Sequence, residues 1–188
     1  MKPLPDTPPP MSTERLLLRP LRDGDIAALF AIYGDAEVMR YASDDTFPNP
    51  STVLTMLASV DRLLVEGASI EWAIEDKRSR ELIGTCGFHS FDAPNGCAEV
   101  GCMLARNTWG QGFMREALRR MFAWARHELG LASLRADIDA ANLRSMRLFA
   151  ALGFARIDTG TCELALSLAD AGAPAEMHDM PARCAADL

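Results

Sequence analysis

Apolar and polar positions change their period several times along the first half of the chain. Residues 15–19 form a short apolar run that predicts a strand. Apolar side chains then recur every three or four positions, which predicts a helix capped by Asp23 or Asp25 and a second helix from Ser51 to Gly67. From residue 70 to 75 apolar and polar residues alternate, so a half-buried strand follows, closed by a polar turn at 76–80.

The second half repeats the change of period. Strands are predicted at 81–89 and 97–104, and an amphipathic helix at 113–125 ends before Gly130, with Glu116 and Arg120 expected to pair on its exposed side. A strand at 134–138, a short helix at 146–153 and a last hairpin reaching about residue 168 complete the order. An antiparallel meander followed by a β-α-β crossover predicts an α/β fold with a mixed, mostly antiparallel sheet and helices on both faces.

The two ends of the chain lack such periodicity. Five prolines lie within the first ten residues, so residues 1–11 are predicted to be a disordered, Pro-rich tail. Residues 169–188 are rich in Ala, Asp, Gly and Pro and are predicted to be a loose C-terminal tail. One folded domain is therefore expected over residues 12–168.

Composition narrows the class of protein. Of the 188 residues 49% are hydrophobic and 24% charged, which is typical of a soluble globular protein. There is no apolar run of ~20 residues and no apolar segment of a signal peptide near the start, so a cytoplasmic protein without a membrane partner is expected. The five cysteines are odd in number and include no C-x-x-C pair, which argues against a disulfide framework and a metal site. A net charge of −7 argues against nucleic acid as a binding partner and suits a cationic acceptor.

A glycine-rich segment joins a predicted strand to the longest helix. Gly110 and Gly112 permit unusual backbone angles, so that successive N–H groups at the helix start can point at one anion such as a pyrophosphate. A turn that only connects strand and helix would use the same glycines. No G-x-x-x-x-G-K-[ST] or strand-borne G-x-G-x-x-G is present, which disfavours kinase-type and dinucleotide sites.

A second segment makes the pattern specific. The sequence W-G-Q-G-F-M-x-E-A at 109–117 is followed, after one strand, by N-x-x-S-x-x-x-F-x-x-L-G-F at 142–154. This pair resembles the GNAT superfamily of N-acetyltransferases, and within it the RimJ/RimL type, which acetylates the N-termini of ribosomal proteins. The segments E-R-L-L-L-R-P-L and A-E-V-G-C-M-L are also similar to that type.

The resemblance implies a fold, a cosubstrate and a binding loop. It implies that strands 97–104 and 133–139 splay apart to seat the pantetheine arm of acetyl-CoA, and that backbone amides of residues 110–115 hold its pyrophosphate. The cofactor-binding residues it implies are Met103, Leu104, Trp109, Gly110, Gln111, Gly112, Phe113, Met114, Arg115, Asn142, Ser145, Arg147 and Phe149. The reaction it implies is direct transfer of an acetyl group to a primary amine in a ternary complex.

Two residues are candidates for proton transfer. Many members of the superfamily use a tyrosine acid where this chain has Phe149, so Ser145, in the first turn of its helix, is the candidate acid. Its alternative role is a local hydrogen bond at the helix start. Glu99 is the candidate base, unless it lies on the solvated face of its strand, and Gly101 could mark a bulge that frees a backbone N–H for the carbonyl oxygen.

Several alternatives remain open at this point. Cys86 with His89 has no orienting partner and suggests a buried thiol rather than a nucleophile, whereas the loop at 40–47 is either a solvated surface or an acceptor lid. The acceptor is a protein N-terminus or a small amine such as an amino acid, a polyamine or an antibiotic. Rival functions are a non-catalytic acyl-CoA-binding module and a nucleotide-binding protein, and a homodimer is expected from the resemblance.

Overall fold

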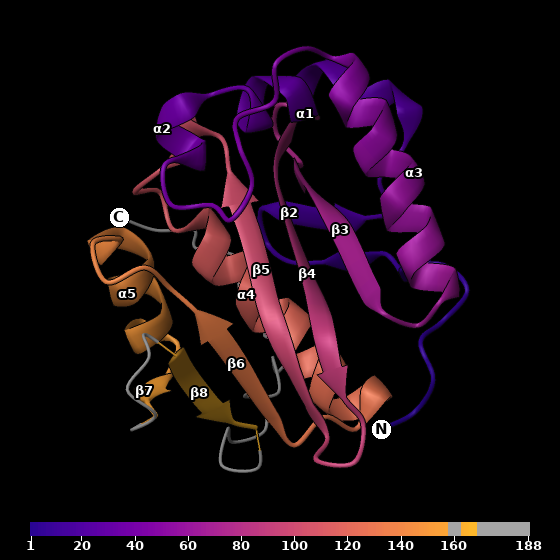
Figure 1. The fold of residues 1–188 in the computed structure, drawn as a ribbon, viewed down its shortest axis with the longest axis vertical. Coiled ribbons are helices and arrows are strands. Elements are labelled where there is room, and N and C mark those ends of the chain that lie inside the picture. The colour runs from indigo at the N-terminus through magenta and orange to yellow at the C-terminus, as the bar shows by residue number, and fades with distance from the viewer. Residues whose placement is uncertain (158–162, 169–188) are drawn as a thin grey trace, which may run out of the picture.

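The computed structural model describes residues 1–157 and 163–168, and in these residues one eight-stranded sheet runs through the molecule (Figure 1). Its strands lie in the order β1-β2-β3-β4-β5-β6-β8-β7. Their bounds are β1 Met11–Ser12, β2 Leu16–Arg19, β3 Ser69–Asp76, β4 Leu82–Asp92, β5 Cys97–Leu104, β6 Ser133–Asp137, β7 Ala155–Arg156 and β8 Glu163–Ser167. The predicted strands are therefore present, and β1 is an addition.

Helices cover both faces of this sheet, as the alternating pattern predicts (Figure 1). One face carries α4, Phe113–Trp124, which continues as a π-helical turn over Ala125–Leu129 and ends at the left-handed Gly130. The opposite face carries α1 Ile26–Tyr33, α2 Ala36–Met39 and α3 Ser51–Val65, of which α2 has no predicted counterpart. The last helix, α5 Leu143–Ala151, lies beside β6 and packs through Phe149 on Phe154.

The sheet is antiparallel except at one place. β5 runs parallel to β6, but only Cys97–Glu99 of β5 is paired with residues 133–135 of β6. Beyond Glu99 both strands continue without pairing each other, so they diverge toward their carboxyl ends (Figure 1). The fold thus confirms the mixed α/β sheet with splayed central strands.

The N-terminal segment differs from the expected disordered tail. Lys2 N–H donates to Leu129 O at 2.8 Å, and the Trp72 indole donates to Pro9 O at 2.9 Å. Met11 pairs with Leu18 in the sheet and is only 2% exposed. Prolines cannot donate hydrogen bonds, but their carbonyls still accept, so an extended proline-rich strand can be held by donors of the domain. The predicted loose tail at 169–188 lies outside the described residues.

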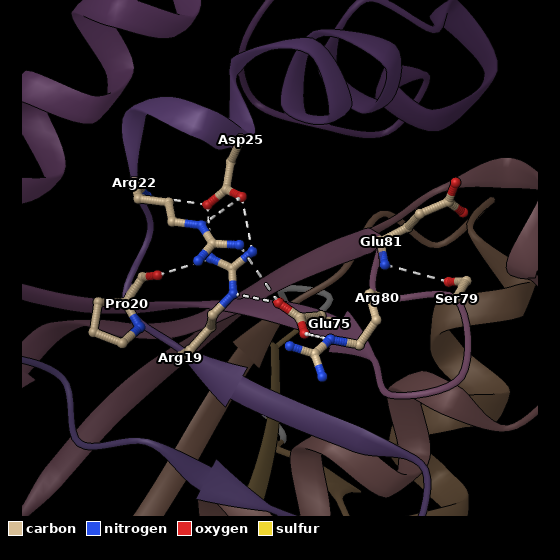
Figure 2. Close-up of polar contacts among 8 residues, drawn as sticks. All are labelled: Arg19, Pro20, Arg22, Asp25, Glu75, Ser79, Arg80 and Glu81. Atoms are coloured by element: carbon tan, nitrogen blue, oxygen red, sulfur yellow. Dashed lines mark hydrogen bonds and ion pairs between the residues drawn. The ribbon is translucent and has the colours of Figure 1, made fainter.

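A buried ion network joins β2, β3 and the start of α1 (Figure 2). The Arg19 guanidinium donates to both Asp25 carboxylate oxygens at 2.8 Å and to Glu75 Oε2 at 2.7 Å. These three side chains are at most 9% exposed. Arg22 and Arg80 reach the same carboxylates from solvent. The hydrogen bonds that Arg19 donates to Asp25 outweigh burial and raise the pKa of Arg19, which stays charged.

Two local predictions are wrong. Glu116 does not pair with Arg120: its carboxylate accepts from Arg15 Nε at 2.7 Å, because the turn between β1 and β2 lies against the first turn of α4. Burial acts to raise the pKa of Glu116, but the hydrogen bonds from Thr13 and Arg15 together lower it. Gly101 makes no bulge, since it pairs regularly with Gly87, and the irregularity of this strand pair lies between His89 and Asp92.

Candidate active site

A cleft of about 810 Å³ opens where β5 and β6 diverge. Its walls are one face of β3 to β5, the carboxyl end of β6, the first turns of α4 and α5, and residues 37–44 around α2. No helix among the described residues is long and apolar enough to cross a membrane. A second hollow of about 910 Å³ runs along the outer face of α4 and shares Gly112 and Arg115 with the cleft.

The glycine-rich loop forms one end of the cleft. Gly110 and Gly112 have φ of 75° and 79°, the left-handed region that favours glycine, and Gly112 is the N-cap of α4. A Cβ on Gly110 would meet no atom within 4 Å, so the space above the loop is open. The first amides of α4 have no side-chain cap and face this space, which is how helix starts bind anions.

The start of α5 lies opposite this loop. Asn142 is its N-cap, and its side-chain oxygen accepts from Ser145 N–H at 3.2 Å. The Arg144 guanidinium stacks on the Trp109 ring at 3.4 Å from the centroid, while the Trp109 indole donates to Leu104 O at 2.8 Å. This stack links the glycine-rich loop to α5 across the cleft, and sequence reasoning missed the contribution of Arg144.

The other end of the cleft is the face of the central strands. Their register aligns three rows of side chains across β3, β4 and β5: Ser69, His89 and Glu99; then Glu71, Gly87 and Gly101; then Ala73, Thr85 and Met103. Glu99 is 29% exposed and its carboxylate lies 4.0 Å from His89 Nδ1. Glu99 is among the residues that line the cleft, so it does not lie on an outer solvated face.

A buried polar chain lies beside these rows. Tyr33 Oη and Thr85 Oγ1 are 2.7 Å apart, and both residues are buried. Burial raises the pKa of Glu71 to about 7, although its hydrogen-bond partner, the Thr85 hydroxyl, acts to lower it. Burial and the charge of Glu71 also raise the pKa of Tyr33, so this phenol stays protonated.

Two cysteines lie near this chain. Burial raises the pKa of Cys102, which lines the cleft, to about 12, and the charge of Glu71 acts in the same direction. Burial likewise raises the pKa of Cys86 well above its usual value. Both are thiols rather than thiolates at neutral pH, which makes them poor nucleophiles.

Comparison with known proteins identifies the family. Residues 15–155 match the acetyltransferase (GNAT) domain. The chain belongs to the GNAT family. A relative from Bacillus licheniformis, the uncharacterized N-acetyltransferase p20, is 35% identical over 142 residues, which cover 76% of this chain and 80% of p20. The GNAT chain is thus an acetyl-CoA-dependent N-acetyltransferase.

Solved structures share the GNAT fold at low sequence identity. Spermidine N-acetyltransferase from Vibrio cholerae, in complex with CoA and spermine, is 17% identical with a TM-score of 0.72, over 84% of this chain and 98% of that one. Mycobacterium smegmatis RimJ, in complex with CoA-disulfide, is 17% identical with a TM-score of 0.71, over 81% of each chain.

The cleft of this GNAT chain brings together most of the residues selected from sequence. Lining it are Glu99, Met103, Leu104, Trp109, Gly110, Gly112, Phe113, Met114, Arg115, Asn142, Ser145 and Phe149. Gln111 and Arg147 are not among the lining residues. Gln111 instead supports the loop, since its side chain donates to Asn107 O at 3.1 Å and its carbonyl accepts from Arg15. Arg147 is exposed on α5.

Sequence reasoning missed the polar chain of Tyr33, Thr85 and Glu71. The alternation over β3 gave Glu71 the appearance of a solvent-facing residue. A signal was nevertheless present: Gly87 and Gly101, two glycines inside adjacent strands, mark a place where something approaches the backbone closely.

Proposed function

We propose that this enzyme transfers the acetyl group by direct attack of a primary amine on acetyl-CoA within a ternary complex. The observation that carries this proposal is that one cleft has the glycine-rich loop at one end and carboxylates at the other. Both substrates would meet where β5 and β6 diverge. The thioester carbonyl is activated by the coenzyme itself, so the protein supplies position and electrostatics.

The state of the cysteines favours direct attack over an acyl-enzyme. Cys102 is the thiol that lines the cleft, and its pKa of about 12 leaves almost no thiolate at neutral pH. His89 makes its polar contacts elsewhere: its Nδ1 lies 3.0 Å from Ser90 Oγ and 4.0 Å from Glu99. No group among the described residues is therefore arranged to activate a nucleophilic cysteine.

The coenzyme would lie along the predicted residues. The open space above Gly110 and the uncapped amides at the start of α4 suit the pyrophosphate. Met103 and Leu104 on the diverging end of β5 would pair with the pantetheine arm, opposite Asn142 and Phe149 of α5.

Two residues are proposed for proton transfer. Only a neutral amine attacks a thioester, so a base must take a proton, and Glu99 would do this directly or through water. Ser145 would protonate the leaving thiolate, because it lies in the first turn of α5, where the helix dipole favours negative charge.

The acceptor is proposed to be a primary amine that arrives as a cation. Glu37, Asp44, Glu71 and Glu99 line the acceptor end of the cleft and favour positive charge there. A protein N-terminus, the acceptor class of the RimJ/RimL type, and a small amine such as a polyamine both fit this description. Assembly as a homodimer in the cytoplasm stays a prediction.

Initial-rate kinetics test the direct transfer. CoA release is measured while acetyl-CoA and each amine of a panel, namely spermidine, n-butylamine and an alanyl tripeptide, are varied together. Intersecting double-reciprocal lines and full activity of Cys102→Ala are expected. Parallel lines, together with an acetylated enzyme detected by mass spectrometry after incubation with acetyl-CoA alone, would overturn the proposal.

Two variants test the proton-transfer roles. Ser145→Ala should lower single-turnover transfer by about 10² to 10⁴ at saturating acetyl-CoA. Glu99→Gln should shift or remove the acid limb of the pH–rate profile with little change in acetyl-CoA affinity. Unchanged transfer rates or an unchanged profile would remove the respective residue from the mechanism.

A further inference from the structure

The row of Glu71, Gly87 and Gly101 leaves a gap in the side chains that cover the cleft face of the sheet. A Cβ on Gly87 would lie 2.5 Å from Glu71 Oε2, so the Glu71 carboxylate occupies the space of a side chain at Gly87. Gly101 is the next position in the row and lines the cleft. Adjacent strands are about 4.8 Å apart, so the carboxylate lies roughly one strand spacing from the Gly101 backbone.

This gap forms a pit with an unusual lining. Gly101 is its floor, Glu71 and Thr85 form one side, and His89 and Glu99 form the other. Glu71 has no cationic partner among residues 1–157 and 163–168, whereas Glu99 has His89 at 4.0 Å. A half-buried carboxylate without a counter-charge attracts a cation that fits beside it.

The pit lies beside the point where the acetyl group is expected. β5 stops pairing with β6 after Glu99, so Gly101 is on the diverging part of β5. A nitrogen atom seated between the Glu71 carboxylate and the Gly101 backbone would contact the carboxylate on one side and face the diverging strands on the other.

We propose that this pit receives the acceptor amine as its ammonium ion and that Glu71 is the carboxylate that binds it. This inference rests on the proposed ternary-complex transfer and assigns the acceptor's charge recognition to one residue. The Thr85 hydroxyl is a hydrogen-bond partner of Glu71 and lies 2.7 Å from Tyr33 Oη, so the carboxylate is supported beside the pit. Glu99 remains the proposed proton acceptor from the bound amine.

Binding of the ammonium ion through Glu71 depends on pH. The titratable groups in the rows beside Glu71 are Tyr33 from α1, His89 from β4 and Glu99 from β5, whereas Cys86 and Cys102 lie at the alternate positions of β4 and β5 and interact with its charge. Tyr33, Cys86 and Cys102 stay neutral well above pH 7, because burial raises the pKa of each. Glu71, with a pKa of about 7, ionises as the pH rises from 6 to 8, so acceptor binding strengthens over this range. An alkylammonium with a pKa of about 10.4 stays charged there, whereas an N-terminal amine of about 7.7–8.0 does not.

The test compares acceptor and coenzyme parameters in Glu71→Gln, using the amine of the panel that the wild-type enzyme acetylates fastest. We expect the acceptor KM to rise at least about tenfold at pH 8 and to lose its dependence on pH, because a desolvated ionic contact is removed. Acetyl-CoA affinity, measured by calorimetry, should stay unchanged. Asp45→Asn, at an exposed carboxylate that is not among the residues lining the cleft, is the matched control and should change the acceptor KM less than threefold, since exposed charges contribute little.

Gly101→Ala supplies a second variant that does not alter Glu71. A Cβ at Gly101 would lie 3.5 Å from His89 Nε2, an ordinary contact, so folding should be preserved while a methyl group fills the floor of the pit. An increase in acceptor KM with unchanged acetyl-CoA affinity is expected. Wild-type turnover combined with unaltered acceptor KM in both variants would overturn this inference alone. An enzyme that binds acetyl-CoA but acetylates no amine of the panel would overturn the inference and the proposed acceptor class together.

Discussion

Glu71 and Glu75 lie four residues apart on the same face of β3, yet their surroundings are opposite. Glu75 is 5% exposed and is bound by Arg19, with Arg22 and Arg80 nearby, so its charge is fully compensated (Figure 2). The hydrogen-bond partner of Glu71 is the neutral hydroxyl of Thr85, and the cleft opens beside its carboxylate. The comparison shows that partners, rather than residue type or strand position, separate a structural carboxylate from one available to a ligand.

The largest expected effect is a loss of stability when the ion network around Glu75 is broken. Arg19→Met keeps the volume of the side chain but leaves Asp25 and Glu75 buried without a counter-charge. Removing one member of a buried ionic network costs about 3–5 kcal/mol, and urea unfolding followed by circular dichroism measures this loss. The control is Arg80→Ala, which removes an 81% exposed partner of Glu75 and should cost at most about 1 kcal/mol. Equal losses would mean that Glu75 does not depend on Arg19.

The coenzyme end of the cleft permits a matched pair of glycine variants. Gly112→Val and Gly67→Val place the same β-branched side chain at φ of 79° and 71°, so the backbone strain should be similar. Gly67 follows α3 and is not among the residues that line the cleft. Calorimetry should show acetyl-CoA affinity lowered about 100-fold, or about 2.7 kcal/mol, in Gly112→Val only. Equal affinity in the two variants would contradict the anion cradle.

Glu71 should have a measurable effect on stability even without a ligand. Its pKa is about 7 in the folded chain and 4.5 when unperturbed, so between these values the folded state holds a proton that the unfolded state has lost. The free energy of unfolding therefore falls as the pH rises from 4.5 to 7. Above pH 7 Glu71 makes no further change to it. At about 1.36 kcal/mol per pKa unit, the largest possible loss of folding stability is about 3 kcal/mol. Solvent access to the cleft reduces this value.

Glu71→Gln measures this effect by difference. The variant should gain stability relative to the wild type as the pH rises from 4.5 to 7, when both are unfolded with urea at several pH values. The contributions of other groups, such as Glu116, cancel in the comparison. A constant difference between the two proteins across this window would mean that the carboxylate of Glu71 is solvated in the folded chain.

Periodicity predicted most of the fold because burial alone decides it. The alternation over β3 and the helical spacing over α4 follow from one face lying against the core, and each appears near its predicted bounds. The N-terminal segment was predicted incorrectly because its contacts are made by carbonyls. Pro9 contributes an acceptor to Trp72, and a sequence rich in proline carries no sign of that.

The features of the site also fall into those that the sequence reveals and those that it does not. The glycine-rich loop was visible in the sequence because left-handed backbone angles require glycine at 110 and 112. Ionic partners brought together by tertiary packing were not visible: Glu116 on α4 pairs with Arg15, about a hundred positions away, rather than with Arg120. The identical residue type at 71 and 75 hides opposite roles, because only the register places Gly87 beneath Glu71 and Arg19 beside Glu75.

The smallest expected effect concerns the polar chain that supports Glu71. Tyr33→Phe removes the hydroxyl that lies 2.7 Å from Thr85 Oγ1 but keeps the ring stacked on Phe47 at 5.1 Å. The Thr85 hydroxyl can still donate to Glu71, so stability should fall by only about 0.5–1.5 kcal/mol, the net value of one hydrogen bond. Urea unfolding measures this loss, and the acceptor KM should rise less than in Glu71→Gln, because Tyr33 acts on the carboxylate only through Thr85. An increase as large as that of Glu71→Gln would mean that the acceptor contacts the Tyr33 hydroxyl itself, and that the carboxylate of Glu71 is not its main partner.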